Sequence, residues 1–142
     1  MRLDFHFNVD HRLQYACRVV RKARAAGKTV LVMARDGDRL ARFDAALWTF
    51  SALDFVPHVA ADSPLAADTP VLLGREAPTA HARDVLLLLD DTAPENFQQL
   101  FERFERVIEV VSRDDEDRAQ ARARFKLYRD SGLQPQVHEA AE

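Results

Sequence analysis

Two adjacent carboxylates, Asp90 and Asp91, are placed where a catalytic or metal-binding group would be expected. They end the apolar run of residues 84–91, and α/β enzymes bind ligands at the carboxyl ends of strands. Carboxylates at this point are equally suited to capping the next helix. We favour the capping role because no phosphate-binding loop accompanies them, and we keep as the alternative a degenerate nucleotide-binding hydrolase that uses Asp90 or Asp91.

The sequence Gly27-Lys28-Thr29 matches the end of a P-loop, which binds phosphate through backbone N–H groups between a strand and a helix. No glycine precedes it at the required spacing, and the three residues lie between an expected helix and an expected strand, which is the reverse order. The four glycines of the chain form no G-x-G-x-x-G motif either. We therefore interpret Gly27 as the end of a helix and expect no nucleotide cofactor.

The other reactive side chains form no recognisable catalytic set. Cys17 falls on the apolar face of an expected helix, with no His or carboxylate placed to activate it, so we expect it in the core. No serine lies in a G-x-S-x-G motif. The five histidines lack the spacing of metal ligands: His6, His11, His58, His81 and His138. These patterns favour a binding protein over an enzyme and predict no metal.

Composition limits the class of protein further. A chain of 142 residues with one cysteine is long enough for one domain with a real core and excludes a disulfide framework. No leader and no apolar run near the ~20 residues of a membrane span is present, so a reducing cytoplasm is expected. The net charge of −3 argues against a general nucleic-acid binder, because phosphate neutralisation leaves a basic footprint. Any basic site must be local.

The elements that would position these side chains alternate between strand and helix periodicity. Strands are expected at residues 2–9, 29–34, 55–60, 71–74, 84–91 and 106–112. Helices are expected from Asp10 as N-cap to Gly27, at about 38–50, at 93–104 with Thr92 as N-cap, and at 114–132. This order predicts an α/β fold, a three-layer α/β/α sandwich with a largely parallel sheet, Rossmann-like but without a phosphate-binding loop. We assign residues 1–133 to one domain and set 134–142 apart as a C-terminal tail that need not be well ordered.

The last helix carries a cationic stripe with one aromatic side chain in it. At 100° per residue, one stripe contains Arg118, Arg122, Phe125, Lys126 and Arg129. An adjacent face of Ala119, Ala123 and Leu127 is suited to packing. The plain interpretation of the stripe is a solvated basic face. An acidic peptide with an apolar end would also match it, because arginine forks bind carboxylates and the ring offers an apolar wall. Direct binding of single-stranded DNA stays an alternative, although the cations are few for tracking a backbone.

Four stretches point to a known family. The sequence LARFDAALWTFSALDFVPH, residues 40–58, joins an amphipathic helix that ends in Ala-Leu-Trp to a following Phe-Val-Pro-His. Three further stretches agree in their order along the chain: AGKTVLVMARD at residues 26–36, ARDVLLLLDD at 82–91 and ARARFKLYRDSGL at 121–133. In order and spacing these stretches resemble the chi subunit of bacterial DNA polymerase III. The similarity spans nearly the whole chain and is weakest at 60–69 and after residue 133.

The resemblance implies a non-catalytic adaptor with two partner sites. Chi links the clamp loader, through a small partner called psi, to the acidic C-terminal tail of single-stranded DNA-binding protein, so contact with nucleic acid would be indirect. The positions matching the tail site are Val111, Arg118, Arg122, Phe125 and Lys126. The positions matching the site for psi, or for a competing helicase partner, are Trp48, Phe55, Val56 and Pro57. Phe125 stands where the family commonly has tyrosine, and Arg118 where it commonly has lysine.

Overall fold

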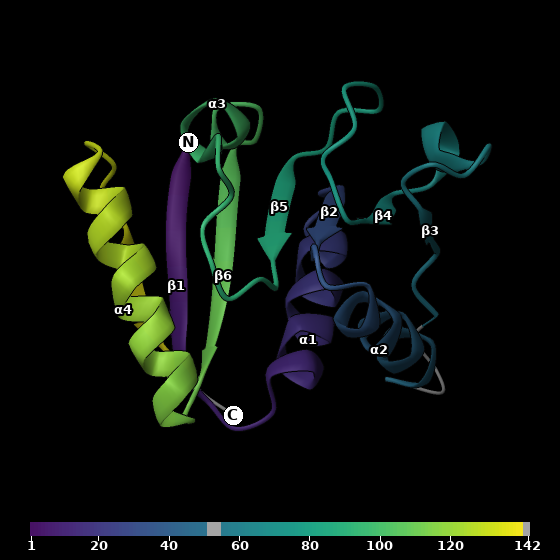
Figure 1. The fold of residues 1–142 in the computed structure, drawn as a ribbon. Helices are drawn as coiled ribbons and strands as arrows, with labels where there is room; N and C mark the ends of the chain where they lie inside the picture. Colours follow the sequence, from purple (N-terminus) through teal and green to yellow (C-terminus); the bar gives the residue numbers. More distant parts are fainter. Residues whose placement is uncertain (51–54, 141–142) are drawn as a thin grey trace.

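The computed structural model describes residues 1–50 and 55–140, which form one seven-stranded sheet with helices on both faces (Figure 1). The strands are β1 (Arg2–Val9), β2 (Val30–Met33), β3 (His58–Ala60), β4 (Val71–Gly74), β5 (Val85–Leu88), β6 (Arg106–Ser112) and β7 (Gln136–Glu139). The helices are α1 (Arg12–Ala25), α2 (Gly37–Thr49), α3 (Phe97–Phe101) and α4 (Asp115–Asp130), with a 3₁₀ turn at Ala66–Asp68. None of these helices is long and apolar enough to cross a bilayer.

The sheet is parallel throughout, in the order β3-β4-β2-β5-β6-β1-β7. Its inner strands β2, β4 and β5 are buried at every position, which explains their unbroken apolar sequences. Parallel strands need crossover connections, and the helices provide most of them.

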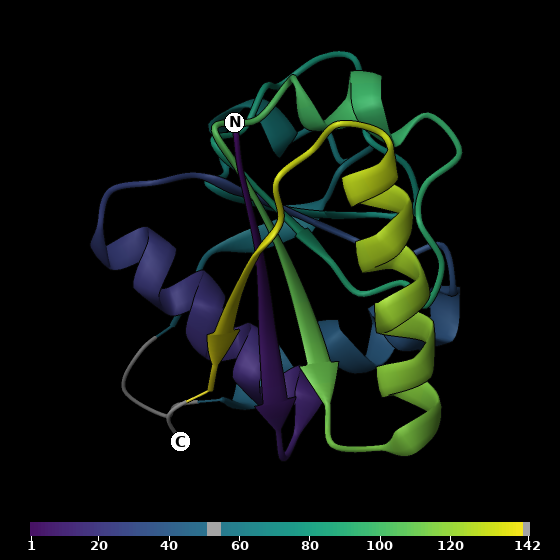
Figure 2. The same ribbon diagram turned by 90° about the vertical axis from the view of Figure 1, so that its left-hand side faces the viewer.

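The helices divide the core between the two faces of the sheet. Side chains of α1 and α2 pack into one apolar cluster, which includes Phe43 and Leu47. Side chains of α3 and α4 pack into a second cluster, which includes Phe101 and Tyr128. Figure 2 shows α1 and α4 on opposite sides of β1 and β6. The predicted three-layer α/β/α fold with a parallel sheet is confirmed.

Local signals at the ends of α1 and α2 agree with the sequence. Gly27 follows α1 with φ of 76°, a left-handed conformation that glycine adopts without strain, so it ends the helix rather than cradling phosphate. Asp36 caps α2 by accepting hydrogen bonds from the N–H groups of Asp38 and Arg39. The start of α1 lies at Arg12, with His11 rather than the predicted Asp10 at the N-cap position.

The predicted helix at 93–104 is much shorter in the structure. It begins at Phe97 after Asn96 rather than after Thr92, and it ends at Phe101. The N–H groups of Arg103 and Phe104 bond three residues back, and the chain then joins the sheet where the Glu105 N–H donates to the Asp84 carbonyl. The apolar side chains of this segment are nevertheless buried, as their spacing predicted: Phe97, Leu100, Phe101 and Phe104.

The last strand, β7, was not predicted. It lies within residues 134–142, which we set apart as a tail, and pairs in parallel with β1 at the edge of the sheet. Its polar sequence resembles a linker, and Val137 is 57% exposed. His138 holds it in place because its Nε2 lies 2.8 Å from Oδ1 of Asp4, a carboxylate that is fully buried in β1.

Candidate peptide-binding groove

A groove of about 420 Å³ lies between α4 and the strands β1, β6 and β7. It brings together four of the five side chains predicted for the tail site: Val111, Arg118, Arg122 and Phe125. Val111 is buried at the groove, and the Phe125 ring packs edge-on against Phe5 with centroids 5.4 Å apart. The groove therefore combines an apolar floor with cationic groups from one helix.

A buried ion pair sets the rotation of α4 about its axis. The Nε of Arg124 donates to Oε1 of Glu109 on β6 at 2.7 Å, and Nη1 donates to the carbonyl of Asp91. Both side chains are almost completely buried, at 3% and 1% exposure. Because Arg124 points into the protein, Arg122 and Phe125 fall beside the edge strands.

The predicted packing face of α4 was wrong. Ala119, Ala123 and Leu127 are exposed. The side chains of α4 that enter the protein are instead Asp117, Ala121, Arg124 and Tyr128. The apolar periodicity of α4 predicted the wrong packing face because two charged residues occupy the inner face of the helix, each with a partner from another element. Arg124 has Glu109, and the Asp117 carboxylate accepts the Ser112 N–H at 2.7 Å.

Asn8 joins the helix to the edge strand. It has φ of 61° and lies where the register between β1 and β6 shifts, between His6 and Val9. Asparagine tolerates this left-handed conformation better than most residues, and such irregularities redirect side chains. The Asn8 amide accepts from Nη2 of Arg118 at 2.8 Å and donates to Glu139 of β7 at 3.1 Å.

The two groove arginines are not equivalent. Arg118 is half-buried and already holds Asn8, so it is a fixed wall of the groove. Arg122 is exposed and has no hydrogen bond or ion pair with any residue that the structure describes. Lys126, the fifth predicted residue, does not line the groove; its Nζ pairs with Asp130 at 2.6 Å on the outer surface. Arg122 is the cation best placed to meet a ligand carboxylate.

Five residues that line the groove were not among the predicted site residues: Phe5, Phe7, Asn8, Ala121 and Val137. The alternation of β1 placed Phe5 and Phe7 on one face, but nothing in the sequence indicated that α4 would lie beside that face. Val137 reaches the groove only because β7 pairs with β1. A short β-branched residue among polar neighbours gives no sequence signal for such an edge.

The second predicted site contains an exposed aromatic pair. Trp48 and Phe55 are 55% and 62% exposed, and their ring centroids lie 5.0 Å apart. Pro57 is exposed beside them, whereas Val56 is buried in the core. His58 supports the segment, because its Nε2 lies 2.8 Å from Asp44 of α2 and its ring lies 4.9 Å from Trp48.

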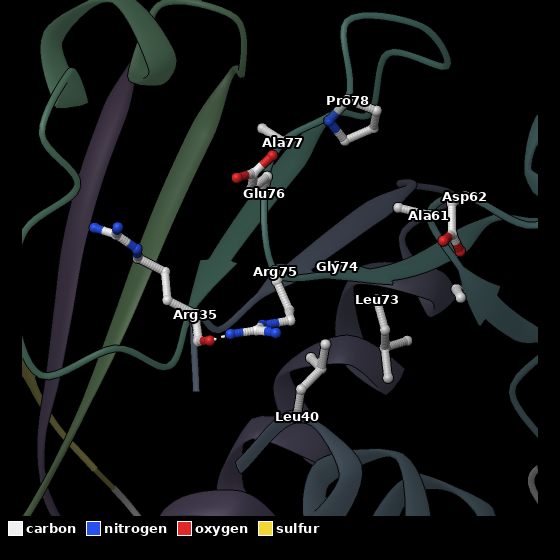
Figure 3. A pocket seen from close by; sticks show the side chains of 11 residues that line it. Arg35, Leu40, Ala61, Asp62, Leu73, Gly74, Arg75, Glu76, Ala77 and Pro78 are labelled. Carbon is white, nitrogen blue, oxygen red and sulfur yellow. Dashed lines mark hydrogen bonds between the residues drawn. The ribbon is translucent and has the colours of Figure 1, made fainter. Parts of the chain in front are cut away.

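The carboxyl ends of β2, β3 and β4 surround a pocket of about 740 Å³ (Figure 3). Arg75 donates from Nε to the Arg35 carbonyl across it, and the carboxylates of Asp62 and Glu76 also line it. The N-terminal N–H groups of α2, which would face a phosphate in a nucleotide-binding fold, are bonded to the capping Asp36. Two arginines and two carboxylates line the pocket among the described residues, so its charges balance.

Asp90 and Asp91 connect elements instead of capping a helix, so the capping interpretation was wrong. Asp90 accepts the Arg35 N–H at 2.7 Å, and burial raises its pKa. Asp91 pairs with Arg39 of α2 at 3.1 Å and with Arg12 of α1 at 3.2 Å. Burial alone would raise the pKa of Asp91, but hydrogen bonds and charge from the two arginines lower it below its ordinary value. Among the described residues, no group of three His, Cys, Asp or Glu side chains could hold a metal ion.

Comparisons with known proteins agree with the resemblance seen in the sequence. Residues 1–136 match the model of the family described as "DNA polymerase III chi subunit, HolC". The chain is 34% identical over 141 residues to DNA polymerase III subunit chi of Pseudomonas aeruginosa, covering 96% of this chain and 95% of that protein. It is 29% identical over 121 residues to subunit chi of Escherichia coli K12, covering 84% and 80%.

A solved structure with almost no sequence similarity shares the fold. The C-terminal domain of Saccharomyces cerevisiae Dbp5 superposes with a TM-score of 0.62 at 11% identity, over 99% of this chain and 90% of that one. This likeness concerns the fold alone. The family match and the curated relatives extend over nearly the whole chain, and on these grounds the protein belongs to the family of the chi subunit of DNA polymerase III, a replication accessory subunit.

Proposed function

We propose that the α4 groove binds the acidic C-terminal tail of single-stranded DNA-binding protein. The observation that carries the proposal is the position of Arg122, an exposed cation beside the apolar floor formed by Val111 and Phe125. A peptide that ends in an aromatic residue would place its side chain on this floor and its terminal carboxylate at the guanidinium. Upstream acidic residues would lie near Arg118, the other cation that lines the groove.

The expected affinity follows from the size of these contacts. Burying a phenylalanine side chain contributes about 1.5–3 kcal/mol, and each exposed ion pair contributes about 0.2–1 kcal/mol. The sum must offset the entropy of association, so we expect binding in the micromolar range, about −8 kcal/mol. Added salt should weaken it because the cations are exposed.

Fluorescence anisotropy with a labelled acidic peptide ending in Asp-Ile-Pro-Phe tests the proposal. We expect Arg122→Ala to weaken binding at least about tenfold, because a charge-assisted hydrogen bond contributes roughly 1.5–3 kcal/mol. Arg129→Ala is the matched control, since Arg129 is exposed on the same helix and does not line the groove. Amidation of the peptide carboxylate should have an effect similar to Arg122→Ala. Equal affinities of wild type, Arg122→Ala and amidated peptide would refute the assignment.

We further propose that Trp48, Phe55 and Pro57 contact a second protein, either psi or another clamp-loader or helicase partner, while buried Val56 supports them. The support is the exposure of two adjacent rings, since large aromatic side chains dominate binding hot spots. The chain would then act as an adaptor at the replisome in the bacterial cytoplasm. Trp48→Ala should abolish co-purification with psi and leave tail-peptide affinity unchanged. Loss of both activities together would point to misfolding and would count against separate sites.

The proposed adaptor has no catalytic activity of its own. The support is that Asp90 and Asp91, the carboxylates considered for catalysis, are bonded to other parts of the protein. A calorimetric titration with Mg²⁺ and ATP should therefore give no binding heat. Saturable binding would instead support the degenerate-hydrolase alternative.

A further inference from the structure

The segment from His11 to Arg35 contains no acidic residue, although the chain as a whole has a net charge of −3. Its cations are Arg12, Arg18, Arg21, Lys22, Arg24, Lys28 and Arg35. Three of them, Arg18, Arg21 and Lys22, occur at spacings of three and four and are exposed on α1. Residues at these spacings are neighbours on a helix surface, so α1 presents a continuous positive face.

These cations border a second groove. It measures about 610 Å³ and lies between α1 and the amino ends of β5 and β6. The charged side chains that line it are Arg18, Arg21, Lys22, Lys28, Glu105 and Arg106. One carboxylate thus faces five cations around the groove.

Two of these cations are available to a ligand. Within residues 1–50 and 55–140, neither Arg18 nor Lys22 has a hydrogen bond or ion pair. Lys28 pairs with Glu105 at 2.8 Å, and Arg106 pairs with buried Asp4 at 2.8 Å. The groove keeps a net positive charge after these pairs are counted.

Two rings lie among these cations. His6 and Tyr15 both line the groove, with ring centroids 5.5 Å apart, and the aliphatic side chains of Val19 and Ile108 extend its apolar surface. Burial, and then the electrostatic interaction with His138, Arg106 and Lys22, lowers the pKa of His6 to about 4. The ring is therefore neutral at physiological pH, and with its Nδ1 hydrogen-bonded to the Tyr15 hydroxyl it forms an uncharged part of the groove wall.

We propose that the α1 groove binds single-stranded nucleic acid, with Arg18, Arg21 and Lys22 on the phosphates and bases against the rings and aliphatic floor. Binding that is independent of sequence combines a positive groove with aromatic faces in this way. The groove is concave and partly apolar, so unpaired bases can enter it, whereas the bases of a duplex are already stacked. An acidic polypeptide fits less well, because carboxylates would not use the ring faces.

The α1 groove is separate from the α4 groove. Alternation along β1 directs Phe5 and Phe7 to the α4 groove and His6 to the α1 groove, on the opposite face of the sheet. The two helices themselves lie on opposite sides of β1 (Figure 2). A bound strand and a bound peptide would therefore not compete for the same residues. The proposal also modifies the expectation from net charge, because a chain that is acidic overall still has one strongly basic face.

Anisotropy of a labelled 20-nucleotide oligothymidylate with the full chain tests this inference. With about four phosphates contacted, the logarithm of the association constant should fall with the logarithm of salt concentration at a slope of about −3. The variant Arg18→Glu/Lys22→Glu should weaken binding at least about tenfold and make the slope shallower by about 1.4. The control, Arg42→Glu/Arg129→Glu, changes the net charge equally at exposed positions outside the groove.

The outcomes separate this site from the peptide site. We expect Arg122→Ala to leave oligothymidylate affinity unchanged and Arg18→Glu/Lys22→Glu to leave tail-peptide affinity unchanged. Circular dichroism verifies that each variant is folded, and Arg18→Gln/Lys22→Gln provides a milder change with an intermediate loss. Equal losses in the groove variant and the Arg42/Arg129 control would overturn the inference. Absence of oligothymidylate binding at low salt, or preferential binding of polyglutamate through Arg18 and Lys22, would overturn it as well.

Discussion

Replacing Arg124 with methionine should destabilise the protein more than any change on the exposed face of α4. The substitution removes the 2.7 Å bond to Glu109 and the bond to the Asp91 carbonyl, and it leaves Glu109 buried at 1% exposure without its partner. Breaking a buried pair on one side costs about 3–5 kcal/mol. That is a large part of the roughly 5–15 kcal/mol by which a domain is stable.

The double variant Arg124→Met/Glu109→Leu should recover most of this loss. A buried pair that is replaced on both sides by apolar groups is often neutral or stabilising, because two desolvation penalties disappear together with the attraction. The coupling free energy between the two positions should then be at least about 2 kcal/mol. The two single variants should each be less stable than the double variant.

Urea unfolding of the full chain, followed by far-UV circular dichroism, measures these free energies. Arg122→Met is the matched control, because Arg122 is exposed on the same helix, and it should change stability by no more than about 0.5 kcal/mol. The tail-peptide affinity of the double variant reports whether α4 keeps its rotation without the pair. An Arg124→Met variant within about 1 kcal/mol of wild type, or a double variant whose loss equals the sum of the single losses, would refute the reasoning.

Three further predictions concern buried or exposed side chains. The pKa of His6 falls from 6.5 to about 4 on folding, so the unfolded chain binds more protons than the folded chain between these pH values. The free energy of unfolding should therefore be at its full value above pH 6.5 and decline by up to about 2 kcal/mol toward pH 4. Urea unfolding at several pH values measures this decline, which should be smaller in His6→Gln. Burial raises the pKa of the Cys17 thiol from 9.0 to about 12. A thiol reagent at pH 8 should therefore label the native protein at least about a thousandfold more slowly than the urea-unfolded protein. Fast labelling of the native protein would contradict the position of Cys17 in the core. Leu127→Glu should alter the thermal midpoint little, whereas Ala121→Glu should lower it strongly; the reverse order would show that α4 is rotated as the sequence had suggested.

Much of the fold could be predicted because local patterns and burial agree. The continuous apolar sequences of β2, β4 and β5 predict covered strands, and each is buried at every position with a strand on either side. Gly27 predicts the end of α1 because few other residues adopt its backbone angle at low cost. The exposed positions of Arg122 and Trp48 could not be read from such patterns, and the family resemblance was needed to single them out.

The wrong predictions share one cause. A contact with a residue far away in the sequence decides whether a side chain is buried or a segment forms a strand. Arg124 would be placed on the surface by its type, but Glu109 on β6 makes its burial favourable. The sequence of residues 136–139 is typical of a linker. These residues form a strand because they pair with the backbone of β1 at the edge of the sheet. By itself, the sequence determined the parallel α/β architecture and the family, since apolar periodicity and ordered motifs are properties of the chain alone. The tertiary structure decided which face of α4 points outward, that β7 completes the groove beside it, and that the cations of α1 border a second groove, because each depends on contacts between elements far apart along the chain.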